Sequence, residues 1–327
     1  MIVSICIPSY NRPSELRRCL ESIPYLDDEI EVLVHDDCSP KIDEIRNLDV
    51  FSNNRNIKLI EGTKNVGFDE NFYSLINAAS GKYLLFCTDD DYFIAEGLVQ
   101  CIKILRNEDA SVIVTPYVDA GTGLIRRQKD MNKNLYTSKI HGSTIFDFIL
   151  LSGLIIRREC LPRYDVSILS KSIYSQVFVC ICSAIQRNIL YLNTPLVYCA
   201  ADGENGFVNT NDPLKADRNH YLSNLQFHKG LIVAIHYADD FCNAEKVIIR
   251  KFEREYALRS STGMLVASKS GRLATIEYLM KMKKLPIKTG ILPLCFACFI
   301  FIFGHKTTIF AHSIAKSVVE KVRKWIL

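Results

Sequence analysis

The sequence predicts an α/β protein, with a mostly parallel sheet flanked by helices and a helical region at the C-terminal end. Three observations lead to this fold class. Strand-like and helix-like segments alternate over the first hundred residues, as they do where helices connect parallel strands. The composition, with 48% hydrophobic and 23% charged residues, is that of a folded globular protein. Acidic clusters follow two of the expected strands, at residues 36–37 and 89–91.

Each element of the first hundred residues has its own signal. The β-branched run at residues 2–7 is expected as a strand that ends at Pro8. Pro13 and Ser14 stand where a helix begins, and the apolar side chains after them recur at helical spacing. Further strands are expected at residues 29–35, 56–62 and 82–88, and a helix at residues 69–79.

The later part of the chain carries weaker signals. A helix is expected at residues 96–105 and a strand at residues 110–118, whereas residues 121–141 are polar and basic with little periodicity, which indicates a loop. Helical and strand-like pieces follow, and the pattern is helical from residue 217 to about residue 284. We therefore expect a first domain at residues 1–215 and a helical C-terminal region at residues 216–327.

The C-terminal region differs from the rest of the chain in charge. Residues 241–327 hold 16 Lys or Arg against 5 Asp or Glu, whereas residues 1–240 hold 24 against 31. Residues 291–303 form an apolar run of 13, shorter than the roughly 17 to 25 residues that span a bilayer. This run is expected to be buried, interfacial or re-entrant. Residues 306–327 have the pattern of a basic amphipathic helix, which predicts contact with an anionic membrane surface.

Other features of the sequence set the expected compartment and partners. The twelve cysteines are expected as reduced, buried thiols, because most lie in apolar runs, Cys295 and Cys298 among them, and no signal-peptide pattern opens the chain. This predicts a cytoplasmic protein attached peripherally to the inner face of the cell membrane. A C-terminal helix packed on its own protein is the alternative to membrane contact. Nucleic acid is not an expected partner, because the basic residues of the tail flank an apolar stripe.

The acidic triplet Asp89, Asp90 and Asp91 follows an expected strand. Mg²⁺ and Mn²⁺ take oxygen ligands and often bind through one or two carboxylates while substrate phosphates complete the shell. Asp89 and Asp91 are the expected ligands, with Asp90 as an alternative second ligand. A solvated turn or a helix cap is the alternative that needs no metal.

A second acidic pair, Asp36 and Asp37, ends another expected strand. A carboxylate at this position is expected to accept hydrogen bonds from a ribose or from a base. Neither glycine-rich phosphate-binding pattern occurs in the sequence. A diphosphate bound here would then need a metal ion to neutralise it, which agrees with the acidic triplet.

Three segments in this order resemble glycosyltransferase family 2 and its GT-A fold: VSICIPSYNRPSELRRCLESI, EVLVHDDCSP and NVGFDENFYSLINAASGKYLLFCTDDDYFIAEGL. The later segments SGLIIRREC and PLVYCAADGENGF are similar to abequosyltransferase-like enzymes of bacterial O-antigen and polysaccharide synthesis. The resemblance implies a catalytic first domain that binds a nucleotide-diphosphate sugar and transfers the sugar to a carbohydrate acceptor. The basic tail makes a lipid-linked acceptor the expected one.

The resemblance also implies roles for individual residues. Asp37 would hydrogen-bond the base, and Asp89 and Asp91 would hold Mn²⁺ or Mg²⁺ on the diphosphate, with Asp91 counted among the catalytic residues. The residues expected around the nucleotide sugar are Pro8, Tyr10, Asn11, Arg12, Asp37, Asn65, Gly67, Asn71 and Asp90.

One departure from the family pattern concerns the general base. Inverting members carry a Glu-Asp pair at the start of a helix in the second half, where this sequence has Ser175 and Gln176, and neither is a base at neutral pH. Asp202, Asp165 and Glu204 are the candidate bases, and Asp202 is equally a candidate metal ligand. For each of them a solvated loop acid is the alternative, so inversion and retention both stay open.

Two other functions compete with sugar transfer. A sugar-phosphate nucleotidyltransferase on a related sheet is one, although such enzymes need a glycine-rich basic loop that residues 8–15 lack. A non-catalytic, membrane-bound carbohydrate-binding protein is the other, and the missing Glu-Asp pair favours it. Assays with an intact nucleotide sugar separate the three.

Overall fold

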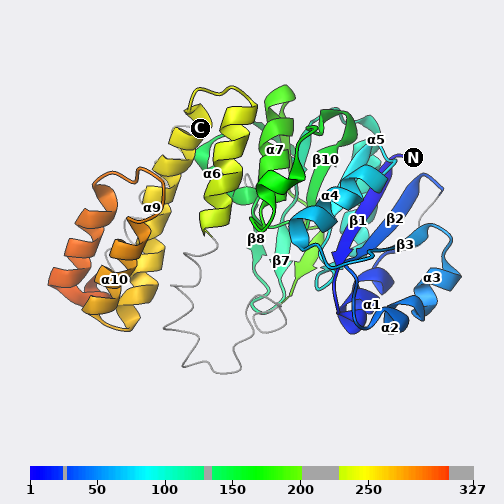
Figure 1. Cartoon of the computed structure of the whole chain (residues 1–327), viewed down its shortest axis with the longest axis horizontal. Helices are drawn as coiled ribbons and strands as arrows, with labels where there is room; N and C mark the ends of the chain where they lie inside the picture. Colours follow the sequence, from blue (N-terminus) through cyan, green and yellow to red (C-terminus); the bar gives the residue numbers. More distant parts are fainter. Residues whose placement is uncertain (25–27, 129–134, 201–227, 309–327) are drawn as a thin grey trace. The chain divides into compact units, whose positions relative to one another are not determined.

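The computed structural model describes residues 1–24, 28–128, 135–200 and 228–308 of the 327-residue chain (Figure 1). Contacts divide the chain into two compact units. The first comprises Met1–Asn209 with Val233–Ile248, and the second comprises Thr210–Ile232 with Ile249–Leu327.

The first unit is built on an eight-stranded sheet with the strand order β3-β2-β1-β4-β10-β6-β11-β9. Its strands are β1 (Val3–Ser9), β2 (Ile30–Asp36), β3 (Ile57–Glu61), β4 (Tyr83–Phe86), β6 (Val112–Val114), β9 (Leu135–Ser138), β10 (Leu154–Arg157) and β11 (Ile189–Leu192). β10 is antiparallel to both of its neighbours and β9 is antiparallel to β11, whereas the other strands run in one direction. The prediction of a mostly parallel sheet is confirmed.

A smaller sheet has the strand order β5-β12-β7-β8. Its strands are β5 (Tyr92–Phe93), β7 (Tyr117–Asp119), β8 (Ile125–Arg126) and β12 (Val197–Cys199). The single strand expected at residues 110–118 is therefore two strands, β6 and β7, in different sheets. The expectation of a loop at residues 121–141 is wrong in part, because β8 and β9 lie within it. These strands are too short to give an alternating apolar pattern, and backbone pairing with β7 and β11 defines them.

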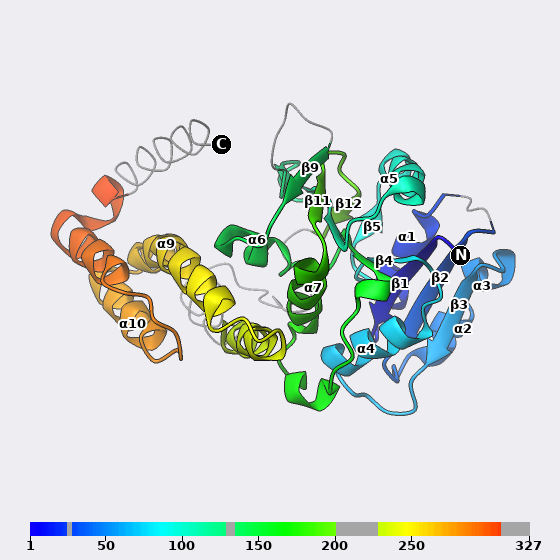
Figure 2. The same ribbon diagram turned by 90° about the horizontal axis from the view of Figure 1, so that it is seen from above.

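Helices cover both faces of the large sheet. They are α1 (Pro13–Glu21), α2 (Ile42–Arg46), α3 (Asp49–Asn53), α4 (Phe68–Ala78), α5 (Ala95–Asn107), α6 (Gly142–Asp147) and α7 (Ser175–Gln186), with short 3-10 turns η1 (Arg158–Cys160) and η2 (Val166–Leu169). α4 and α7 lie on one face, and α1 and α5 lie on the other (Figure 2). The helices expected at residues 12–23, 69–79 and 96–105 are thus confirmed.

The core of the first unit follows from the alternation of side chains along β1. Val3, Ile5 and Ile7 are fully buried in one apolar cluster, together with Leu16 of α1 and Leu98 of α5, because successive side chains of a strand point to opposite faces. Burying one such side chain stabilises the fold by roughly 1.5 to 3 kcal/mol. The cluster fixes β1 and β4, and the residues that follow these strands are thereby held at one edge of the sheet.

The second unit is helical in the residues that the structure describes. It contains most of α9 (Val247–Lys269), all of α10 (Arg272–Met282) and a helical stretch at residues 292–308. Large apolar side chains are exposed on the last stretch, with Phe301 at 48%, Ile302 at 66% and Phe303 at 52% of full exposure. In the part of the chain that the structure describes, no helix is long and apolar enough to cross a membrane.

The structure tests the expectation of reduced, buried cysteines but not the expected amphipathic helix at the end of the chain. All twelve cysteines are free, and eight of them are buried. The expectation of burial is wrong for Cys38, Cys295 and Cys298, which are exposed, and for Cys242, which is half-buried. Cys295 and Cys298 are exposed because they lie on a helix whose apolar side chains are only partly covered. The predicted basic amphipathic helix lies largely outside the described residues, which end at residue 308.

Candidate active site

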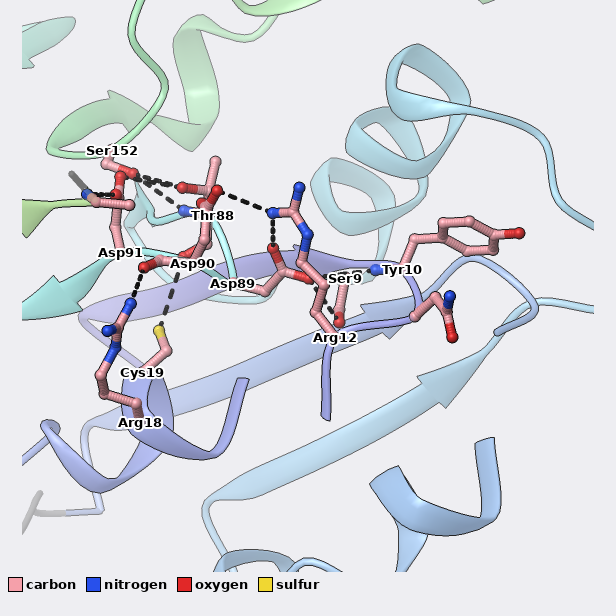
Figure 3. Close-up of polar contacts among 12 residues, drawn as sticks. Ser9, Tyr10, Arg12, Arg18, Cys19, Thr88, Asp89, Asp90, Asp91 and Ser152 are labelled. Atoms are coloured by element: carbon pink, nitrogen blue, oxygen red, sulfur yellow. Dashed lines mark hydrogen bonds and ion pairs between the residues drawn. The ribbon is translucent and has the colours of Figure 1, made fainter. Parts of the chain in front are cut away.

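The loop after β1 meets the acidic triplet at the carboxyl ends of β1 and β4 (Figure 3). The Asp89 carboxylate accepts hydrogen bonds from Ser9 Oγ at 3.0 Å, from the Tyr10 amide at 3.3 Å and from Arg12 Nη1 at 3.1 Å. The same Arg12 nitrogen donates to Asp90 Oδ2 at 2.8 Å. Arg12 therefore ties the first two acids of the triplet to the first loop.

Asp91 has different partners from Asp89. Its carboxylate accepts from Thr88 Oγ1 at 3.0 Å and from the Ala200 amide at 2.8 Å, and the Ser152 hydroxyl lies beside it (Figure 3). Ser152 Oγ in turn accepts from the Thr88 amide at 3.0 Å. Asp91 is thus held by its own loop and by two distant segments of the chain.

The triplet is buried and short of positive charge. Asp89, Asp90 and Asp91 are 5%, 7% and 4% exposed. Burial raises the pKa of Asp89 to about 7 although Arg12 opposes the shift, and burial together with the Asp90 charge raises the pKa of Asp91. Buried carboxylates in this state favour a further cation or a proton. The triplet therefore has the chemistry of a partial cation site.

A complete metal cage is absent from the described residues, since no three His, Cys, Asp or Glu side chains converge there. Two carboxylates and substrate phosphate oxygens form a sufficient shell for Mg²⁺. The buried carboxylates of this donor set fit a hard divalent cation, and the neighbouring Cys199 thiol stays protonated, because burial raises its pKa.

The Asp37 carboxylate is hydrogen-bonded to the backbone of a neighbouring loop. Its Oδ1 accepts from the Val66 amide and its Oδ2 from the Gly67 amide, both at 2.8 Å. Gly67 has φ 83° and precedes α4, a conformation that glycine adopts without steric cost. Asp37 therefore fixes the segment that leads into α4, and its predicted contact with a base would use the remaining acceptor capacity of this carboxylate.

The other residues expected around the nucleotide lie at the same sheet edge but differ in exposure. Tyr10 is 44% exposed, and Asn11 and Asn65 are also exposed. Pro8 is buried within β1. Asn71 is buried as well, and its Nδ2 donates to the His35 carbonyl at 3.2 Å and to the Ser9 carbonyl at 3.5 Å. Asn71 thus ties the ends of β1 and β2 together.

The start of α7, where the family's acidic pair is missing, is held by a buried carboxylate of α4. Asp69 accepts from Ser172 Oγ at 3.1 Å, from the Ile173 amide at 2.8 Å, and from the amide and hydroxyl of Ser175 at 3.1 and 2.7 Å. Ile173 has φ 59°, a strained conformation for a β-branched residue. Gln176 donates to the Ile149 carbonyl at 2.7 Å.

The candidate bases are only partly described. Asp165 is exposed, and its carboxylate accepts from the Ser167 amide at 2.9 Å as the cap of η2. Asp202 and Glu204 lie outside the described residues. The role of each stays a prediction.

Sequence reasoning missed four residues of this region. Thr88 and Ser152 support Asp91, Asp69 supports the start of α7, and Arg127 donates to the Ser152 carbonyl. Of these four residues, only Asp69 had a signal in the sequence, as an acid at the start of an expected helix. Thr88, Ser152 and Arg127 lie outside the expected helices and strands or at their ends, where polar side chains are common.

Comparison with known proteins identifies one domain of the chain. Residues 4–164 match the model of glycosyl transferase family 2. The chain carries a family 2 glycosyltransferase domain. The expected family and enzyme class are thereby confirmed, and the acidic triplet lies within this glycosyltransferase domain.

Two curated proteins are similar to this glycosyltransferase. Abequosyltransferase RfbV of Salmonella typhimurium is 25% identical over 231 residues, which cover 62% of this chain and 68% of that protein. An uncharacterized glycosyltransferase of Haemophilus influenzae is 26% identical over 246 residues, which cover 69% and 79%.

Solved structures are similar in fold. S. aureus TarS 1–349 in complex with UDP-GlcNAc has a TM-score of 0.53 and 16% identity, over 96% of this chain and 92% of that one. Another TarS crystal structure has a TM-score of 0.52 and 17% identity, and this glycosyltransferase covers 55% of its chain, about half its length. These likenesses confirm the GT-A fold.

Proposed function

We propose that this glycosyltransferase moves a sugar from a nucleotide-diphosphate sugar to a saccharide acceptor in bacterial O-antigen or other polysaccharide synthesis. The observation that carries the proposal is the buried acidic triplet beside the first loop of a family 2 domain. The similarity to an abequosyltransferase and the fold shared with a protein crystallised with UDP-GlcNAc support the donor class.

Mn²⁺ or Mg²⁺ is the proposed cofactor, held by Asp89 and Asp91. When bound, such an ion neutralises the charge that develops on the leaving diphosphate. The proton favoured on Asp89 by burial would leave as this carboxylate becomes a ligand. Arg12 lies against Asp89 and Asp90, where its guanidinium is suited to phosphate oxygens.

The nucleoside is proposed to lie between the first loop and the segment before α4. Tyr10 offers an exposed ring, and Asn65 and Gly67 belong to the segment that Asp37 fixes. The proton acceptor for the acceptor hydroxyl is proposed among Asp202, Asp165 and Glu204, since the amide of Gln176 is not basic.

A donor screen tests the proposal. The protein is heated with Mn²⁺ and, in turn, uridine, cytidine, guanosine and thymidine diphosphate sugars. Saturation by a ligand that binds only the folded state is expected to raise the unfolding temperature by roughly 5 °C, with one nucleotide preferred.

The donor that binds is then incubated with lipid-linked and free saccharides, and release of nucleoside diphosphate is measured. Transfer to a saccharide supports the proposal. Pyrophosphate release from a nucleoside triphosphate and a sugar phosphate would show a nucleotidyltransferase instead. Binding of saccharides without any turnover would show a non-catalytic protein.

The acceptor is proposed to be lipid-linked, and the protein to act in the cytoplasm on the inner face of the cell membrane. Support comes from the second unit, which combines the basic residues of the chain's end with exposed Phe301, Ile302 and Phe303. Apolar side chains flanked by basic ones are typical of helices that lie in an anionic interface.

Ile302→Ser is expected to lower the partitioning of the protein onto phosphatidylglycerol-containing vesicles by roughly tenfold, because an inserted Ile contributes about 1.5 to 3 kcal/mol. Sedimentation with vesicles measures this. Ile185→Ser, at an exposed isoleucine of α7 in the first unit, is the matched control and should not change partitioning. Equal partitioning of both variants would refute the membrane assignment.

A further inference from the structure

We propose that Arg127 is a positioning residue for the acidic triplet. Its guanidinium donates hydrogen bonds to backbone carbonyls of the loop before β10 and so places the Ser152 hydroxyl against Asp91. This inference rests on the proposed function, because a fixed position of Asp91 matters only if this carboxylate holds the metal ion of the reaction. The contacts of Arg127 carry it.

The Arg127 guanidinium donates to four backbone carbonyls. Nε donates to Thr115 O at 2.8 Å, and Nη2 donates to Ser152 O at 2.6 Å. Nη1 donates to both Asp147 O and Leu150 O at 3.0 Å. Three of these acceptors lie within residues 147–152, which run from the last residue of α6 into the loop before β10. One side chain therefore sets the path of this loop.

The surroundings leave little freedom for this guanidinium. It lies over the Tyr117 ring at 5.5 Å. Gly153 has φ 79°, and a Cβ there would lie 2.9 Å from Arg127 Nη2 and 2.3 Å from Thr115 Oγ1. A glycine is thus required where the loop enters β10, because both the backbone conformation and the space exclude a side chain.

Arginine suits this role better than lysine does. The guanidinium is a planar group with five N–H donors in a fixed arrangement, whereas an ammonium is a compact group on a flexible stem. The planar group can donate to carbonyls on several sides at once in one fixed orientation. Arg127 itself has φ 63°, so its backbone also departs from an ordinary strand at this point.

A short chain of hydrogen bonds connects Ser152 to the acidic triplet. The Ser152 carbonyl accepts from Arg127, while its hydroxyl accepts from the Thr88 amide at 3.0 Å and lies 3.1 Å from Thr88 Oγ1. Figure 3 shows this hydroxyl beside both Thr88 and Asp91. Thr88 Oγ1 also donates to Asp91. Loss of Arg127 would let Ser152 shift and would loosen Asp91 from two sides.

Residues that orient metal ligands without touching the metal change metal affinity by 10 to 100-fold in known sites. Arg127→Gln is therefore expected to weaken Mn²⁺ binding to the nucleotide-loaded protein by roughly tenfold or more. Electron paramagnetic resonance of free Mn²⁺ measures this without turnover. Arg126→Gln is the matched control, since Arg126 is half-exposed and its ion pair is with Asp119 at 3.8 Å.

A double-variant cycle tests whether Arg127 acts through Ser152. Ser152→Ala should weaken Mn²⁺ binding on its own, and Arg127→Gln with Ser152→Ala should be no worse than the stronger single variant, because coupled residues are not additive. Additive losses would overturn the route through Ser152. Arg127→Lys serves where the glutamine variant fails to fold, and unchanged Mn²⁺ affinity in this folded variant would overturn the proposal.

A metal-free readout separates this inference from the proposed function. The amides of Thr88 and Ala200 donate to Ser152 and Asp91, so their hydrogen exchange should accelerate in Arg127→Gln and stay unchanged in Arg126→Gln. Absence of Mn²⁺ and nucleotide binding in the native protein would refute the proposed function alone. Unchanged exchange in Arg127→Gln would refute the positioning role alone.

Discussion

Asp91→Asn is expected to lower sugar transfer by roughly 10³-fold while the protein stays folded. The amide keeps the shape of the side chain: its oxygen can accept from the Ala200 amide, while its NH2 group can donate to the Thr88 hydroxyl, which donates to Asp91 in the native protein. It carries no charge, so the proposed metal loses a ligand and the leaving diphosphate loses its neutralising partner. A loss of several kcal/mol in transition-state stabilisation corresponds to this rate change.

The measurement is the initial rate of transfer at saturating donor and Mn²⁺, with the thermal unfolding midpoint as a check of folding. Asp49→Asn, at an exposed acid at the start of α3, is the control and should retain the native rate. A variant of Asp91 that keeps more than about a tenth of the native rate would exclude this carboxylate from the metal site. Asp89→Asn then decides whether the other predicted ligand carries the ion alone.

Asp69→Ala is expected to lower the free energy of unfolding by about 3 to 5 kcal/mol. Asp69 is 2% exposed and accepts four hydrogen bonds from the turn before α7. Its removal leaves buried donors without an acceptor, and an unsatisfied buried group costs more than a hydrogen bond contributes. The strained backbone of Ile173 loses the contact that holds it.

Urea denaturation at neutral pH gives this quantity. Glu70→Ala changes the neighbouring acid of the same helix turn and is expected to alter stability by less than about 0.5 kcal/mol. The loss of unfolding free energy in Asp69→Asn should lie between those of Glu70→Ala and Asp69→Ala, because one oxygen acceptor remains. A loss below about 1 kcal/mol in Asp69→Ala would mean that water replaces the carboxylate and that the turn does not depend on it.

The parts of the fold that the sequence predicted are those with local signals. Val3, Ile5 and Ile7 alternate along a strand, and Leu16 and Leu20 recur along a helix. The sequence pattern alone therefore predicted β1 and α1. The acidic triplet was found for the same reason, because it stands directly after an apolar strand.

The residues that could not be predicted act over long separations. Asp69 and Ser175 are 106 residues apart, and Asp91 and Ala200 are 109 apart. Arg127 lies in a segment whose strands are set by backbone pairing rather than by side-chain pattern. A single sequence contains no signal for such pairs, because their meeting depends on the packing of the whole sheet.

Asp37 illustrates a partial success. Its place at the end of β2 was predicted, yet its two oxygens hold the Val66 and Gly67 amides. The residue type fitted two roles, ligand contact and loop support, and the sequence did not distinguish them. The structure adds the second role, and the first stays a prediction.

The reversed direction of β10 has a consequence for how this enzyme class can diversify. Because β10 runs against β4, its amino end lies beside the carboxyl end of β4, where Gly153 donates to Phe86 O at 3.0 Å. The segment that precedes β10 therefore reaches the acidic triplet, although segments preceding the parallel strands end at the opposite edge. Exchange of residues 141–152 between related enzymes would therefore change the residues next to Asp91, while β1, β2 and β4 keep their own sequence.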